Sequence, residues 1–151
     1  MEKRENKNIM IEVKKWLNLA ETDLKVSKIL EDSKNYSNSV YHSQQASEKA
    51  VKSILILLGE QIYEHKVSTE FYDVVFNKYP YDYIEEIYFN LTELETHWLK
   101  SRYILKTRQN VLIDPLEVYD KKKSSNLYKK SEQVIKLTKK FLKEEFDFNF
   151  N

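Results

Sequence analysis

The chain contains one glycine and two prolines among its 151 residues, and this scarcity limits its fold more than any other feature. Tight turns between strands depend on Gly, Asn and Pro for their backbone angles, so an all-β fold is disfavoured. A glycine-rich phosphate loop needs several glycines close together, and the only glycine here is Gly59. Nucleotide-binding folds built on such loops are therefore excluded, and a mostly helical chain is expected.

Other features of the composition narrow the class of protein further. The sequence has no Cys, which rules out disulfides, thiol catalysis and zinc sites with thiolate ligands. The longest apolar run, Ile54 to Leu58, is far shorter than the roughly 20 residues that span a bilayer. The N-terminal segment is polar and lacks the apolar stretch of a signal peptide. We therefore expect a soluble, cytoplasmic protein with no membrane contact, no metal and no cofactor.

Apolar residues recur every three or four positions along most of the chain, as on the buried face of an amphipathic helix. We predict one all-α domain over residues 1–151, an up-and-down bundle of four to five helices without strands. Its core is expected from about 8 to 146, between short polar tails. The predicted long helices cover about Asn8–Glu31, Tyr36–Leu58 and Asp82–Arg108. A short helix before the last of these is expected to be capped by Ser68 or Thr69 and to run to about Asn77, and a final helix is expected to be capped by Ser124 or Ser125 after a loop over 109–120.

The second predicted helix has two unusual faces. Small residues that let two helix backbones approach closely recur along one face, namely Ser39, Ser43, Ala46 and Ala50. Polar residues linked by steps of three and four share another edge, namely Gln45, Glu48, Lys49 and Lys52. A solvent-facing edge would explain these polar residues without any function.

Charge is unevenly distributed, although the formal net charge is only +1. Five acids and no Lys or Arg lie between Tyr81 and Glu95, whereas nine lysines and one acid lie between Lys121 and Lys143. A segregated basic end can attract phosphate. A lysine-rich helix face in solvent is the simpler interpretation, and we favour it.

No residue pattern identifies a catalytic centre. The histidines His42, His65 and His97 lack the partner four residues away that a helical metal site requires. No nucleophile elbow or catalytic triad is evident in the sequence. The catalytic residues are therefore unknown at this point.

The string QQASEKAVK, residues 44–52, is the most specific motif in the chain. It resembles the second helix of HEPN domains (higher eukaryotes and prokaryotes nucleotide-binding), in which a Gln-Gln-Ala-x-Glu-Lys-Ala-x-Lys run is usual. Residues 16–24 resemble the first helix of that family, His65 matches the His that opens its third helix, and Arg102-Tyr103 matches an element near the end of its fourth. The resemblance extends over most of the chain.

The resemblance implies a helical bundle that pairs as a homodimer. Many HEPN domains belong to toxin–antitoxin systems beside a minimal nucleotidyltransferase, and others are metal-independent ribonucleases. These ribonucleases use an Arg-x4-6-His motif, in which the Arg stabilises phosphate charge and the His moves a proton. No His follows Arg102 in this chain, so the standard ribonuclease site is incomplete.

Three functions stay open. The first is a binding module for a nucleotide, RNA or a minimal nucleotidyltransferase partner. The second is a metal-independent ribonuclease with a non-standard site around Arg102. The third is a structural adaptor that acts through its dimer face. The residues implied for ligand binding are Arg102, Tyr103, Lys106, Gln45, Lys49 and Lys52.

The position of Arg102 separates these possibilities. We predict that Arg102 and Lys106, four residues apart, lie on one side of the fourth helix beside the polar edge of the second. That arrangement would form an anion-binding patch. The structural alternative is that Arg102 pairs with Asp23 or Glu48 as a buried link.

Overall fold

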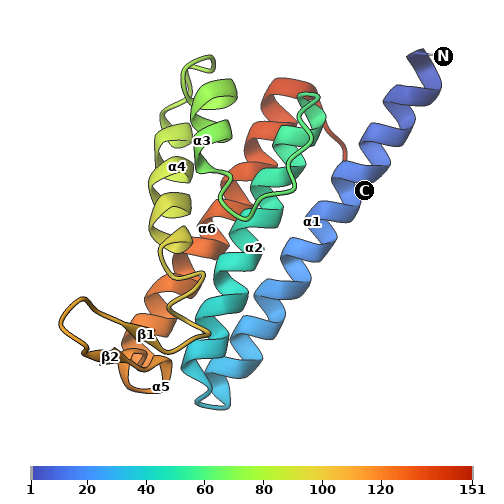
Figure 1. Ribbon diagram of the computed structural model, residues 1–151. Helices are drawn as coiled ribbons and strands as arrows, with labels where there is room; N and C mark the ends of the chain where they lie inside the picture. The colour runs from blue at the N-terminus through green and yellow to red at the C-terminus, as the bar shows by residue number, and fades with distance from the viewer. Residues whose placement is uncertain (1, 151) are drawn as a thin grey trace.

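Four long helices form an up-and-down bundle in the computed structural model, which describes residues 2–150 and the side chains of 5–150 (Figure 1). They are α1 (Glu2–Asp32), α2 (Tyr36–Leu57), α4 (Asp82–Glu95) and α6 (Lys121–Phe146). Short helical segments join them, α3 (Ser68–Phe71) with the π-helical turn η1 (Tyr72–Phe76), and α5 (Pro115–Val118). The predicted helical bundle is confirmed. No helix in the described part of the chain is long and apolar enough to cross a membrane.

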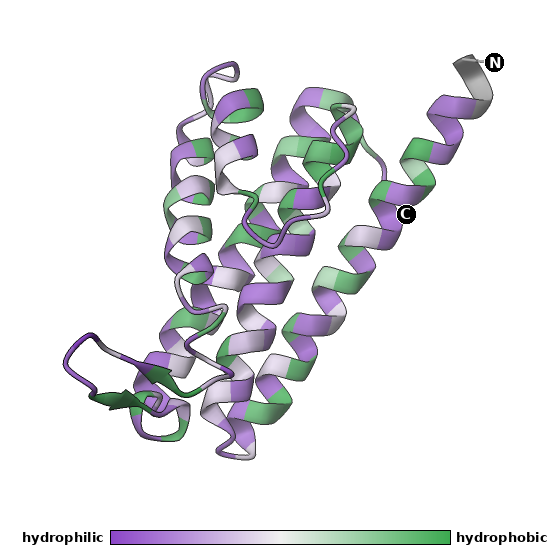
Figure 2. Ribbon diagram, viewed as in Figure 1, coloured by the Kyte–Doolittle hydropathy of each residue, from purple (hydrophilic) through white to green (hydrophobic). Residues whose placement is uncertain are grey.

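The core lies where the four long helices face one another. Each helix contributes one apolar stripe, and apolar and polar residues alternate around the helices as Figure 2 shows. Burying a Leu, Ile or Phe side chain contributes about 1.5–3 kcal/mol, so these stripes hold the bundle together. Residues that are fully or almost fully buried include Val13, Leu17, Ile54, Leu55, Ile87, Leu91, Leu94, Val134, Phe141 and Leu142.

The small-residue face of α2 lies against both α1 and α6, as the sequence predicts. Five buried serines meet there, and we call them the serine junction. Ser27 Oγ donates to the Ser39 carbonyl (2.8 Å) and lies 2.7 Å from Ser43 Oγ. From α6, Ser124 Oγ donates to Ser39 Oγ (3.0 Å) and Ser131 Oγ to the Ser43 carbonyl (2.6 Å). Side chains this small allow three helix backbones to approach, and their hydroxyls satisfy one another.

The fourth helix ends at Glu95, well before the predicted end at Arg108. Residues 96–103 form successive turns instead. The Thr96 hydroxyl donates to the Glu93 carbonyl (2.7 Å), a local bond that competes with the helical backbone pattern. The prediction of a helix up to Arg108 is therefore wrong, and this changes where the residues after Glu95 lie.

A small hairpin follows these turns and contradicts the expectation of a structure without strands. Strands β1 (Leu105–Lys106) and β2 (Leu112–Ile113) pair antiparallel, and both project from one end of the bundle (Figures 1 and 2). Asn110 at the turn has a φ of 63°, a left-handed conformation that Asn tolerates better than most residues. The Val111 N–H donates to the Thr107 hydroxyl (3.1 Å), which closes the turn.

The start of α6 and the tail that follows the helix differ from the prediction. The helix begins at Lys121, because the Asp120 carboxylate accepts from the Lys123 N–H (2.8 Å) and so caps it. Ser124 cannot act as the cap because it belongs to the serine junction. After α6, Asp147 turns the chain with a φ of 51°, and Phe148 is 2% exposed in the core. The C-terminal tail is thus partly core rather than polar.

Candidate functional site

The polar edge of α2 is covered by α1 on one side, and by segment 60–67 and the turns after α4 on the other. Gln45, Glu48 and Lys52 are only 7%, 2% and 7% exposed. A solvent-facing edge therefore does not explain these residues. We call this edge and its neighbours the polar seam, which comprises Asp23, Tyr41, His42, Gln45, Glu48, Lys49, Lys52, His65, Trp98 and Arg102.

Arg102 is held among aromatic rings. Its guanidinium carbon lies 4.5 Å from the centre of the Trp98 ring, 4.7 Å from that of Tyr41 and 4.9 Å from that of Tyr103. Its Nε donates to the Trp98 carbonyl (3.0 Å). Cation–π contacts of this kind contribute roughly 0.5–2 kcal/mol each and fix the plane of the guanidinium without neutralising its charge. Since Tyr41 belongs to α2, these contacts also confirm that Arg102 lies beside the second helix.

Asp23 is engaged by two residues of α2. His42 Nδ1 lies 2.9 Å from one oxygen of Asp23, and Lys49 Nζ donates to the other (2.5 Å). Burial acts to raise the pKa of Asp23, but the hydrogen bonds from His42 and Lys49, with their charges, outweigh it and lower that pKa. Asp23 is therefore a carboxylate whose two oxygens are both occupied.

Glu48 is the second carboxylate of the seam. Lys52 Nζ lies 3.6 Å and His65 Nδ1 3.2 Å from its oxygens. Burial raises the pKa of Glu48, and the nearby Lys52 and His65 offset only part of that effect. Among the residues with described side chains, no carboxylate lies within ion-pair distance of Arg102. The structural alternative, a buried link from Arg102 to Asp23 or Glu48, is therefore wrong.

The structure brings most of the expected ligand-binding residues together. Gln45, Lys49 and Lys52 lie on one edge of α2, and Tyr103 contacts Arg102 directly. The two lysines are not free, because Lys49 pairs with Asp23 and Lys52 with Glu48.

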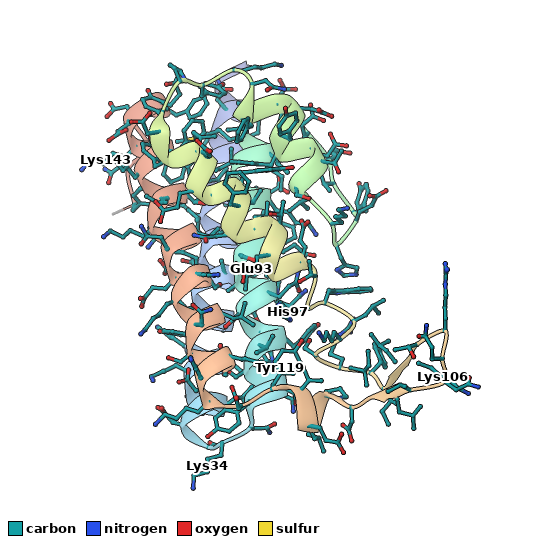
Figure 3. All side chains as sticks on the ribbon, turned by 90° about the vertical axis from the view of Figure 1, so that its left-hand side faces the viewer. Lys34, Glu93, His97, Lys106, Tyr119 and Lys143 are labelled. Atoms are coloured by element: carbon teal, nitrogen blue, oxygen red, sulfur yellow. The ribbon has the colours of Figure 1, made fainter. Side chains whose placement is uncertain are left out.

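Lys106 does not belong to this group. It lies on β1 of the projecting hairpin, is exposed, and is seen in Figure 3 away from the bundle. The prediction that it lines one side of a helix with Arg102 fails because α4 ends at Glu95.

Three residues of the seam were not predicted as site residues, namely Tyr41, Trp98 and His65. The His65 ring stacks on the Trp98 ring, with centres 4.6 Å apart, and Trp98 also contacts Arg102. Of these three residues the sequence singled out only His65, as a match to the family and as a histidine without a metal-site partner. These contacts join segments that are distant in the sequence, so no local spacing reveals them.

A cavity of about 690 Å³ opens beside His65 and Trp98. Glu95 also lines it, and one Glu95 oxygen accepts from the N–H groups of Val67 (2.8 Å) and Ser68 (2.9 Å). This carboxylate caps the start of α3, in place of the side-chain cap expected from Ser68 or Thr69. The end of α4 thus positions the segment that contains His65.

His97 lies outside the seam. Its Nδ1 lies 2.7 Å from the Tyr119 hydroxyl, and the two labelled side chains are neighbours in Figure 3. Burial lowers the pKa of His97, and the positive charges of Lys100, Lys123 and Lys130 lower it further. The pair joins the turns after α4 to the segment before α6, which is a structural role.

These features, a helical bundle with a polar second helix facing an arginine, define a HEPN domain. The family model for the HEPN domain matches residues 13–142, and the chain belongs to this family. It is 39% identical over 137 residues to the Methanocaldococcus jannaschii protein named "Putative toxin MJ1304", a match that covers 88% of this chain and 90% of that protein.

Two solved structures share the fold. One is ST0689, an archaeal HEPN homologue, with a TM-score of 0.64, 23% identity, and coverage of 85% of this chain and 95% of that one. The other is TT1696 from Thermus thermophilus, with a TM-score of 0.69, 16% identity, and coverage of 85% and 96%. At these identities the likeness concerns the fold alone.

Proposed function

We propose that the chain is the HEPN module of a toxin–antitoxin-type system, and that its polar seam binds a phosphate-bearing ligand, a nucleotide or RNA, in the cytoplasm. The similarity to "Putative toxin MJ1304" supports the type of system. The observation that supports a phosphate ligand is the state of Arg102, a half-buried cation that is held by aromatic rings and has no carboxylate partner among the side chains described.

The charges of the seam favour an anion. The two carboxylates Asp23 and Glu48 pair with Lys49 and Lys52, whereas the third cation, Arg102, has no carboxylate partner among the described side chains. Arg102 is left with a net positive charge in partly desolvated surroundings, which an anion would offset. A planar guanidinium with several N–H groups suits phosphate oxygens better than it suits a single acceptor.

The proposal includes two protein partners that follow from the family: a second copy of the chain and a minimal nucleotidyltransferase. It does not include the standard ribonuclease reaction, because Arg102 lacks the His that completes that motif. If neither a nucleotide nor RNA binds, the adaptor function through the dimer face becomes the better account.

Replacing Arg102 by Ala tests the proposal, with Arg108→Ala as the matched control, because Arg108 is exposed on the hairpin. Binding of nucleoside mono- and triphosphates and of a single-stranded RNA is measured by calorimetry. Losing a charge-assisted hydrogen bond worth about 1.5–3 kcal/mol weakens binding roughly 10- to 150-fold. Arg108→Ala is expected to bind like wild type.

Equal binding by both variants would remove Arg102 from the ligand site. Thermal unfolding provides an independent measurement, because a ligand at a hundred times its Kd adds about 2.7 kcal/mol of stability. No change in melting temperature with any of these ligands would contradict the proposal.

A metal-independent ribonuclease is the second candidate function, and His65 is the observation that favours it. This half-exposed imidazole and Arg102 both contact Trp98, so a proton carrier lies near the guanidinium without the standard motif. General acid–base catalysis contributes roughly 10²–10⁴-fold, so His65→Ala should slow cleavage of labelled RNA at least 100-fold, with EDTA having no effect. Cleavage at an unchanged rate in this variant, or none in wild type, counts against it.

A further inference from the structure

Seven of the nine lysines of α6 fall into two groups, and the other two, Lys121 and Lys123, lie at the start of the helix. Three of them pair with acids: Lys130 with Glu93, Lys139 with Glu21, and Lys140 with Glu144. A second group is exposed, and within the described residues its ammonium groups have no hydrogen bond, ion pair or ring contact. We call this group the lysine row, which comprises Lys122, Lys129, Lys136 and Lys143.

The members of the lysine row are seven residues apart. Seven residues make nearly two helical turns, so each member lies ~10.5 Å further along α6 and only about 20° around it. The row therefore follows one side of the helix for ~31 Å. Lys143, at its end, points away from the bundle in Figure 3.

The acids of α6 do little to neutralise the row. Glu144 accepts from the Tyr83 hydroxyl (2.8 Å), and Glu145 from the Tyr81 hydroxyl (2.6 Å). Glu132, the one acid between Lys121 and Lys143, is three residues from Lys129 and four from Lys136, but its carboxylate contacts the Tyr128 hydroxyl (3.5 Å) and forms an ion pair with neither lysine. The solvent side of α6 is thus a regular line of free positive charges, on a protein whose formal net charge is only +1.

We propose that the lysine row binds the phosphodiester backbone of a single-stranded nucleic acid. This goes beyond the ligand proposed for the polar seam, because α6 packs on α2 at the serine junction and the seam occupies another edge of α2. Phosphate contacts fix a strand in place without selecting its sequence, which suits a line of evenly spaced ammonium groups. The exposed ring of Phe150, which lines the same surface hollow as Lys136 and Lys143, offers a face on which any base can stack.

A nucleic acid fits this surface better than a protein or a membrane does. No large apolar side chain is exposed between Lys121 and Phe146. Protein interfaces need an apolar or aromatic centre, and a helix that lies on a membrane inserts an apolar face. The apolar face of α6 is already buried in the core, through residues such as Val134 and Phe141.

The test replaces all four lysines of the row by Gln in the full chain. The matched control replaces four exposed lysines elsewhere, Lys7, Lys15, Lys25 and Lys78, and so removes the same charge. Binding of fluorescein-labelled polyuridine RNA and polythymidine DNA is measured by anisotropy over a range of salt concentrations. Four lost phosphate contacts should reduce the slope of log K against log salt by about 2.8, for RNA and DNA alike.

The control variant is expected to keep most of the wild-type slope, and a Lys→Arg version of the row to keep all of it. An unchanged slope in the row variant overturns the inference, and so does an equal loss in the control, since net charge alone would then explain binding. A loss confined to RNA, or binding to anionic vesicles alone, also overturns it. Adding Arg102→Ala to each variant separates the lysine row from the polar seam. The four Lys→Gln substitutions should reduce the salt slope by the same amount whether or not Arg102 is present.

Discussion

The two polar faces of α2 differ in how their buried groups are satisfied. At the serine junction, uncharged hydroxyls from three helices bond to one another and to carbonyls, and Ser27, Ser39 and Ser43 are completely buried. At the polar seam, charged groups come from distant parts of the chain, and the Trp98 ring nitrogen is buried without a hydrogen-bond partner among the described residues. Burial of polar residues thus serves packing on one face, and on the other leaves charge and hydrogen-bonding capacity unmatched within the described part of the chain.

The largest effect is expected from Ser43→Leu, which places a bulky side chain where α1, α2 and α6 meet. Overpacking and the lost hydroxyl bond together should destabilise the protein by about 3 kcal/mol. Urea unfolding followed by circular dichroism measures this, and Asn38→Leu, at an exposed position of the same helix, should change stability by less than about 0.5 kcal/mol. Similar midpoints for the two variants would show that the serine junction is not tightly packed.

A smaller effect, which depends on pH, is expected at the seam. Burial holds the pKa of Glu48 above its ordinary value of 4.5, although Lys52 and His65 face it, so the folded protein binds this proton more tightly than the unfolded chain. From pH 4.5 up to the raised pKa, ionisation of Glu48 therefore reduces stability as the pH rises. In that pH window, the free energy of unfolding of Glu48→Gln should rise relative to that of wild type by up to about 1.4 kcal/mol per pH unit.

Asp23, in the same seam, should change stability with pH in the opposite direction to Glu48. Its pKa is lowered, so its contribution to stability is present above the unfolded pKa and is lost as the pH falls through the folded pKa. Asp23→Asn should therefore weaken the protein at neutral pH and converge with wild type in acid. Unfolding curves at several pH values, with the exposed Glu12→Gln as control, check both signs. Parallel curves for all variants would contradict the assignment of these two carboxylates.

The smallest effect is expected at Thr138, whose buried hydroxyl has no hydrogen-bond partner within residues 5–150. Thr138→Val keeps the shape of the side chain and removes an unsatisfied group, so stability should stay within about 0.5 kcal/mol of wild type or rise. Ser131→Ala on the same helix should cost about 1 kcal/mol, because its hydroxyl donates to the Ser43 carbonyl. Thermal unfolding compares the two, and an equal loss would mean that hydrogen bonding does not distinguish them.

The helices that were predicted well are those whose apolar stripes end at a turn signal. The end of α2 was predicted within one residue, since Gly59 follows it with a φ of 87°. The end of α4 was not, because apolar residues such as Leu105 continue the helical period past Glu95. The turns that end α4 lie next to the contact of His97 with Tyr119, a partner from another part of the chain.

The candidate site could also be predicted only in part from the sequence. The polar edge of α2 and Arg102 follow from local spacing and from the family motif, and the structure places them side by side. The stacking of His65 on Trp98 joins two residues of which one was expected in a connection and the other inside a helix. A contact of this kind depends on tertiary packing, which sequence periodicity does not describe.

The pair of His97 and Tyr119 has a practical consequence for the segment between them. It ties together the two places where the chain leaves and rejoins the bundle, so the hairpin is an excursion anchored at its base. The free energy needed to close an anchored loop grows only with the logarithm of its length, by roughly 0.6 kcal/mol for each doubling. The turn around Asn110 is therefore a suitable place to insert a fluorescent label or an affinity tag without disturbing the bundle.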